Sequence, residues 1–170
     1  MPNRMDTILS TGAGVVRRFK ARLAGLTGVW RTLAEQHGEV MVLMERAKAS
    51  DEKFTTLWPT IKRELVSHEK AEVREVFPTL RTSPVTRSFA DHHDAEANQL
   101  EYLVKKIDEL AIGAQERRDT FQTLSDTVAH HAKEEENEIF PKAQEAFGKE
   151  VAERLDAKFK AAKKRVAEAV

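Results

Sequence analysis

Apolar residues recur along most of this chain at alternating steps of three and four residues. This spacing places them on one face of an α-helix, whereas a half-buried strand would alternate at every second residue. Helix start signals stand at Ser50 and at Ser83-Pro84, and glycines that favour helix ends stand at Gly113 and Gly148. The pattern predicts an all-α protein with helices over residues 6–23, 27–48, 51–77, 83–112, 115–147 and 148–170.

Each of the four long helices predicted between residues 27 and 147 carries a histidine in the middle of its apolar face. In the second and fourth of these helices a glutamate follows four residues later, one turn further along the same face. A buried imidazole or charged carboxylate without a partner is costly, so a shared cation best explains their convergence in one core. The predicted metal ligands are His37, His68, Glu72, His93, His131 and Glu135.

Two segments of the chain repeat each other closely. Residues 68–78 and 131–141 both read H-x-K-x-E-x-x-E-[VI]-F-P, and each follows a helix with one histidine on its apolar face. This order predicts two helical hairpins related by a pseudo-two-fold axis, with two equivalent metal ions around it. The alternative for each histidine–glutamate pair is an ordinary i,i+4 pair on a solvated helix face. The repeated context and the position on the apolar face favour metal ligation.

The composition of the 170 residues excludes several other kinds of site. The absence of cysteine excludes disulfides, thiolate zinc sites and iron–sulfur clusters. A formal net charge of zero gives no overall field that would attract nucleic acid or an acidic membrane. No apolar segment has the length of a signal-peptide core or a membrane span, so we expect a cytoplasmic monomer or weak homodimer. The basic segments 17–22 and 158–165 are predicted to be solvated helix faces, with partner or membrane-surface contacts as the alternative.

These residues together resemble the hemerythrin-like family, also called the HHE cation-binding domain. Members of that family form an up-down four-helix bundle whose helices supply His, HxxxE, His and HxxxE in order. The E-E-x-x-[IV]-F-P ending that is typical of the family stands here at residues 135–141. The resemblance covers residues 27–147 and implies a hemerythrin-like core within a single domain of residues 1–170. Residues 1–26 would add an N-terminal helical extension, and residues 148–170 a C-terminal helix.

The resemblance also implies a cofactor. Two iron ions joined by an oxo or hydroxo group would be held by the four histidines as terminal ligands, with Glu72 and Glu135 as bridges. Manganese and zinc fit less well. Structural zinc takes four ligands, and six converging nitrogen and oxygen donors exceed that number.

This chain departs from the oxygen-carrying members of the family at one ligand. Those proteins place another histidine four residues after the first one on the third helix, where this chain has Ala97. Their last carboxylate ligand would fall on Glu136 rather than Glu135. The missing ligand would be replaced by Glu69, Glu96, His92 or His130, or its position would stay open to a small ligand.

Three classes of function are compatible with such a centre. The first is a protein that binds or senses O₂, peroxide, NO or iron. The second is an enzyme or repair factor that decomposes peroxide or donates iron to damaged clusters. The third is a structural bundle without a physiological metal. Fold alone does not choose among them, but the missing histidine leaves more open coordination than an oxygen carrier has, which favours sensing or reactivity over O₂ storage.

Overall fold

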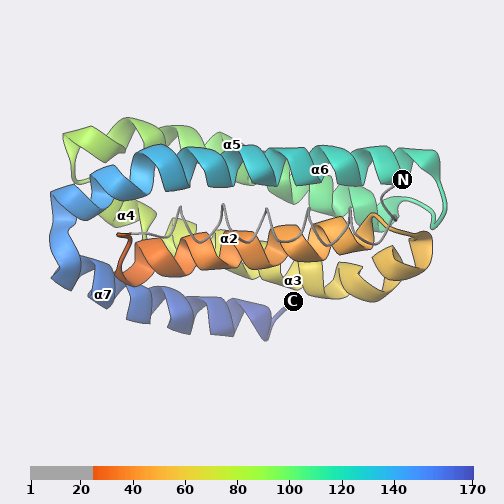
Figure 1. Ribbon diagram of the computed structural model, residues 1–170, viewed down its shortest axis with the longest axis horizontal. Helices are drawn as coiled ribbons and strands as arrows, with labels where there is room; N and C mark the ends of the chain where they lie inside the picture. Colours follow the sequence, from red (N-terminus) through yellow and green to blue (C-terminus); the bar gives the residue numbers. More distant parts are fainter. Residues whose placement is uncertain (1–24) are drawn as a thin grey trace, which may run out of the picture.

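Helices make up almost all of residues 25–170, the part of the chain that the computed structural model describes, and no strand occurs there (Figure 1). The helices are α2 (Gly28–Ala47), α3 (Asp51–Glu75), α4 (Phe77–Leu80), α5 (Pro84–Glu109), α6 (Gln115–Glu134), the π-helix η1 (Glu135–Ile139) and α7 (Phe140–Ala167). The all-α prediction is therefore confirmed. The helix predicted over residues 6–23 lies outside the described residues. Within residues 25–170, no helix combines the length and the apolar character that crossing a bilayer requires.

The helix ends follow from local chemistry. The Ser50 hydroxyl accepts a hydrogen bond from the backbone N–H of Lys53 at 3.1 Å and caps α3, and Ser83 caps α5 in the same way. The third predicted helix ends at Glu75 instead of residue 77. Pro78 cannot donate the backbone hydrogen bond that would continue α3, and it occupies the first turn of α4 instead.

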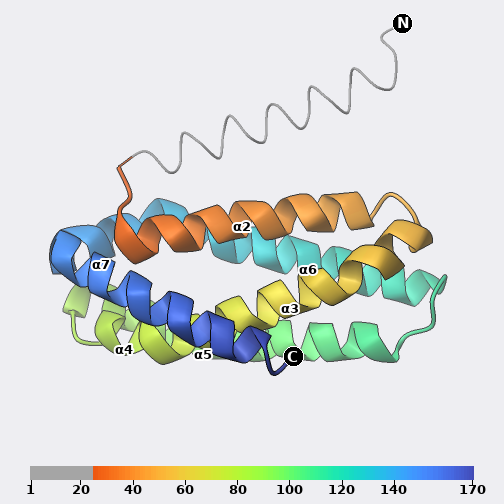
Figure 2. The same cartoon turned by 90° about the horizontal axis from the view of Figure 1, so that it is seen from below.

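The four helices α2, α3, α5 and α6 run alternately up and down around a common core, as predicted (Figures 1 and 2). The chain then turns at one end of the bundle, and α7 packs along the outside of α3 and α2. Gly148, with a φ of 75°, interrupts the helical geometry inside α7 and allows its second half to turn back. The predicted helix over 115–147 is thus three elements: α6, η1 and the first part of α7.

The second half of α7 approaches the start of α2 very closely. Gly28 has a φ of 54°, and a Cβ atom built on it would lie 2.5 Å from the carbonyl carbon of Ala152. Only glycine fits there, because any side chain would meet the backbone of α7. The backbone N–H of Thr27 also donates to Gln144 Oε1 at 2.7 Å. These contacts fix the position of α7 against the four-helix bundle.

Two apolar clusters fill opposite ends of the bundle and leave a polar layer between them. The first contains residues from the start of α2, the end of α3, the short helix α4 and both halves of α7, among them Trp30, Leu33, Phe77, Phe140 and Phe159. The second contains residues from the other end of the four helices, among them Met44, Ile61, Leu103, Ile107 and Leu124. The predicted metal ligands lie in the layer between these clusters, where the apolar residues on either side shield them from water.

Candidate metal centre

The structure brings all six predicted ligands together in this polar layer. They come from α2 (His37), α3 (His68 and Glu72), α5 (His93), α6 (His131) and the start of η1 (Glu135). The side chains of Glu72 and Glu135 are completely buried, and the four histidine side chains are 12% exposed or less. The ring centroids of His37 and His68 are 5.0 Å apart, and those of His93 and His131 are 4.6 Å apart. The six side chains thus lie in one layer, and their role as metal ligands stays a prediction.

The two buried glutamates face histidine nitrogens that have no hydrogen bond. Glu135 Oε2 lies 3.3 Å from Nε2 of His37 and 3.3 Å from Nε2 of His131. Glu72 Oε2 lies 3.3 Å from Nε2 of His68. In the described part of the chain, neither oxygen of either glutamate makes a hydrogen bond of good geometry, and neither do these three nitrogens. Buried polar atoms are rarely left this way in proteins, so the arrangement fits a group that supplies the missing bonds, such as a cation.

The opposite nitrogen of each of these three rings faces an oxygen. His37 Nδ1 lies 2.9 Å from Glu136 Oε1, and His131 Nδ1 lies 3.1 Å from Glu96 Oε2. His68 Nδ1 lies 3.0 Å from Oε1 of Gln36. An oxygen of this kind only accepts, so a neutral ring donates from Nδ1 and keeps a lone pair on Nε2. Histidines that ligate metals are held in this way by partners outside the metal's own ligands.

His93 differs from the other three histidines. Its Nε2 lies 2.6 Å from Glu69 Oε1, and its buried Nδ1 makes no hydrogen bond to any residue in the range 25–170. The ring stacks on Phe77 with centroids 4.2 Å apart. Burial lowers the pKa of His93, but the hydrogen bond with Glu69 and the charges of Glu69, Glu135 and Glu72 together outweigh burial and raise the pKa overall.

Among the residues that the structure describes, two groups of side chains are compact enough to hold a metal ion. In each group, one possible ligand atom from every residue lies within 4.8 Å of the others. One group is Glu69, His93 and His131, and the other is Glu72, His131 and Glu135. Of the alternatives for the missing ligand, Glu69 is therefore one that lies at the centre. His92 and His130 are exposed on the surface and do not lie at the centre.

The π-helix η1 explains how two consecutive glutamates enter the core. The buried positions here recur every four residues, at 131, 135, 139 and 143. In a straight α-helix each such step would rotate the next side chain by about 40° away from the core. The wider π turn reduces this rotation, so that Glu135 and Glu136 are both buried and Glu136 reaches His37. A continuous α-helix was the wrong prediction here, and the spacing of four was the signal in the sequence.

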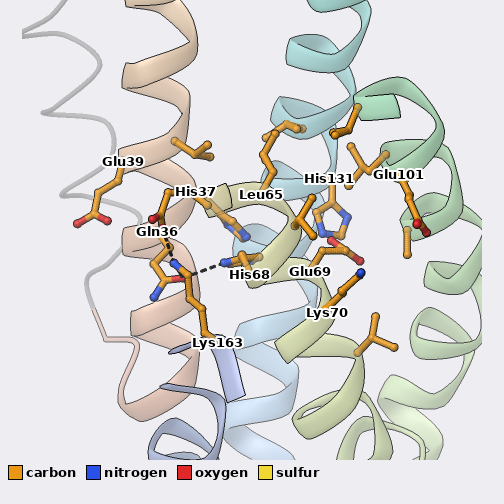
Figure 3. A pocket seen from close by; sticks show the side chains of 18 of the residues that line it. Gln36, His37, Glu39, Leu65, His68, Glu69, Lys70, Glu101, His131 and Lys163 are labelled. Atoms are coloured by element: carbon orange, nitrogen blue, oxygen red, sulfur yellow. Dashed lines mark hydrogen bonds and ion pairs between the residues drawn. The ribbon is translucent and has the colours of Figure 1, made fainter. Parts of the chain in front are cut away.

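A cavity of about 530 Å³ adjoins the centre (Figure 3). His37, His68 and His131 lie on its wall, together with Ala97. Most of the remaining wall is apolar, with contributions from Val40, Leu43, Leu65, Leu100, Val104 and Val128. Exposed residues, including Glu39, Lys70 and Glu101, line its outer part. A small molecule therefore has a route from the surface to three of the predicted ligands.

Sequence reasoning missed two residues beside the centre, Gln36 and Lys163. Lys163 belongs to the basic segment 158–165, and the prediction of a solvated face is wrong for this residue. Its side chain is only 15% exposed, and its Nζ lies 2.7 Å from Gln36 Oε1 and 2.7 Å from Glu64 Oε2. The other basic residues of the segment are exposed, namely Lys158, Lys160, Lys164 and Arg165. The basic segment 17–22 lies outside the described residues.

The protonation of the histidines predicts how the metal-free protein responds to pH. Burial lowers the pKa of His37, but its contacts with Glu135 and Glu136 outweigh burial and raise the pKa from 6.5 to about 9. Burial likewise lowers the pKa of His131, but the charge of Glu135 and the hydrogen bond with Glu96 raise it to about 10. Burial raises the pKa of Glu72, but the contact with His68 lowers it to about 2, so this glutamate stays charged.

We expect the metal-free protein to be most stable between about pH 4.5 and 6.5 and to lose stability as the pH rises toward 9 and 10. The folded state keeps protons on His37 and His131 that the unfolded chain releases near pH 6.5, so their stabilisation disappears above the folded-state pKa values. Melting temperatures measured across this range test the prediction. The metal-loaded protein should depend less on pH, because bound metal displaces the same protons. A flat profile for the metal-free protein would contradict the assigned contacts.

The protein-family model described as the hemerythrin HHE cation binding domain matches residues 28–143. This range begins at the start of α2, ends in the first part of α7 and includes all six predicted ligands. Neither a curated protein nor a solved structure gave a match.

Proposed function

Because the chain belongs to the hemerythrin HHE cation-binding family, we propose that it holds two iron ions in the polar layer and binds or senses O₂, peroxide or NO there. One observation carries the proposal. Both oxygens of Glu72 and Glu135 lack hydrogen bonds within the described residues, and these glutamates face histidine nitrogens that lack them as well. Metal–ligand bonds would replace all of these missing interactions at once.

The ligand roles follow from which atoms face the interior. His37, His68 and His131 would bind metal through Nε2, and Glu72 and Glu135 would bridge the two ions. Glu69 is our candidate to replace the histidine ligand that oxygen carriers have at the position of Ala97. Its carboxylate lies beside His93 and in one compact group with His131. Imidazole and carboxylate donors suit iron, with manganese as the main alternative. Bound iron would supply redox chemistry and a coordination position for a small ligand.

The remaining residues of the site orient the ligands and control access. Glu136 and Glu96 accept the Nδ1 protons of His37 and His131, which fixes both rings and increases the basicity of Nε2. The apolar clusters above and below exclude water. Ala97 presents only a methyl group to the cavity that His131 also lines, and a larger side chain there would narrow the cavity. An open cavity favours binding, sensing or reaction of a small ligand over a purely structural role.

We also propose that the second half of α7 is part of the same domain as residues 27–147. Phe159 and Ala162 are buried in the first apolar cluster together with Trp30 and Phe77. A segment that completes the core of the bundle folds with it.

Anaerobic loading with Fe(II) tests the proposed function. We expect about two irons per chain, as the two histidine–glutamate pairs suggest, and an absorption change on adding NO, azide or O₂. The variant Ala97→Phe should keep its iron and respond more slowly or weakly, because the new ring fills the cavity beside His131. Val42→Phe is the matched control, since Val42 is 44% exposed and lies on the outside of α2.

The outcomes separate the classes of function. A stable oxygenated spectrum indicates a binding or sensing protein, and catalytic release of O₂ from peroxide indicates an enzyme. Two irons that ignore NO, azide and peroxide would overturn the small-ligand proposal and favour storage or a structural role. One zinc ion without iron would overturn the iron centre itself.

A further inference from the structure

The partner of His68 Nδ1 differs in kind from the partners of the other two histidines. Glu136 and Glu96 face His37 and His131 with carboxylates, which only accept hydrogen bonds. Gln36 faces His68 with an amide, which carries an oxygen and an NH₂ group and can present either one. If the NH₂ group faced His68, it would donate to Nδ1, and the neutral ring would carry its proton on Nε2. That nitrogen would then have no lone pair for a metal ion.

Lys163 removes this ambiguity. Its Nζ lies 2.7 Å from the same Gln36 Oε1 atom that accepts from His68, and Glu64 Oε2 accepts from it at 2.7 Å on another side (Figure 3). An ammonium group only donates hydrogen bonds, so it requires the amide oxygen and excludes the NH₂ group from this position. With the oxygen fixed, a neutral His68 ring keeps this hydrogen bond only by donating from Nδ1, although the Glu72 carboxylate attracts a proton to Nε2, and Nε2 then keeps its lone pair.

The lysine comes from a part of the chain outside the four-helix bundle. Lys163 lies in the second half of α7, and the family model ends at residue 143. One turn earlier on α7, Phe159 meets the His68 ring edge to face, with centroids 5.6 Å apart. The outer helix thus contacts His68 directly by packing and reaches it by hydrogen bonding only through Gln36.

We propose that Lys163 is a positioning residue that fixes the Gln36 amide and through it the Nδ1-protonated tautomer of His68, so that α7 prepares this histidine for metal binding. The consequence for metal rests on the proposed function. The tautomer does not, because it is a property of the metal-free chain.

The tautomer is measured directly by ¹⁵N NMR on the metal-free, full-length protein, at a pH high enough to keep the ring neutral. Long-range ¹H–¹⁵N couplings distinguish a protonated Nδ1 from a protonated Nε2, and His68→Gln identifies the signal. We expect the Nδ1-protonated form in the wild type and in Lys163→Arg, which still donates. Lys163→Met should give a mixture, and Lys163→Glu should favour the Nε2-protonated form, because a carboxylate attracts the amide NH₂ group. Lys164→Met is the control, since Lys164 is exposed on the same turn.

Metal affinity provides the second measurement. Changing a partner of a ligating histidine typically weakens metal binding about 10–100-fold. We expect a loss of this size in Lys163→Met and Lys163→Glu for one of the two Fe(II) ions, rescue in Lys163→Arg and no change in Lys164→Met. An unchanged His68 tautomer in both Lys163→Met and Lys163→Glu would overturn the proposal whatever happens to metal. If the His68 tautomer changes in the Lys163 variants but the wild-type protein binds no metal, the positioning role is supported and the proposed function is overturned instead.

Discussion

Replacing Glu135 with alanine should remove most of the bound metal, with a loss of affinity of at least tenfold. Glu135 Oε2 is equally close to His37 and His131, at 3.3 Å from each Nε2 atom, so its carboxylate stands where it can serve two ions. Loss of a bridge weakens both ions, whereas loss of a terminal ligand weakens one. Glu72→Ala should behave in the same way. Metal content after purification and Fe(II) titration measure the effect.

Glu138→Ala is the matched control for this experiment. Glu138 lies in the same π turn as Glu135, but it is exposed to solvent. Glu135→Gln adds a second test, because it keeps the shape of the side chain and removes the charge. Equal metal loss in Glu138→Ala and Glu135→Ala would rule out the bridging role.

Removal of the metal should lower the melting temperature while the helices persist. The two apolar clusters at the ends of the bundle do not depend on metal, so the circular dichroism signal of the helices should remain. When a metal binds only the folded state and its free concentration is about 100 times its Kd, the free energy of unfolding rises by roughly 2.7 kcal/mol. For a chain of this size, this rise corresponds to an increase of about 5–10 °C in melting temperature. Adding Fe(II) should restore the melting temperature. Thermal melts before chelation, after chelation and after adding Fe(II) measure the change.

Glu135→Ala is also the control for the melting experiment. Without its bridge this variant should show little change in melting temperature on adding Fe(II). A wild type whose melting temperature ignores metal would favour the structural-bundle alternative.

The sequence predicted most of the fold because one physical signal ran through all four bundle helices. The apolar steps of three and four residues placed His37, His93 and His131 on the inner faces, and burial of these residues follows from that placement. The family model over residues 28–143 agrees with the resemblance of residues 27–147. Helix starts were at their predicted positions where a serine cap marked them, whereas the helix predicted to end at residue 112 before Gly113 ends at Glu109.

Other parts of the centre could not be predicted because they depend on how helices pack together. Lys163 meets Gln36 across 127 positions of the chain, and nothing in the basic segment 158–165 distinguishes it from its exposed neighbours. The role of Glu69 depends on how α3 is rotated relative to α5, since its partner is His93. A single sequence encodes the face of each helix but not the distance between two faces.

The π turn has a wider consequence for the molecule. Phe140 follows it directly, is completely buried and stacks on His37 with centroids 6.0 Å apart. Deleting one residue from the turn would convert it to an ordinary α-helical turn, so that Glu135 and Glu136 could no longer both face the core while the helix that follows, with Phe140, kept its orientation. The length of this five-residue segment is therefore a shared constraint on the metal centre and on the attachment of α7. We therefore expect insertions and deletions that surface loops tolerate to disrupt the protein when they are made in this turn, even at exposed positions such as Asn137.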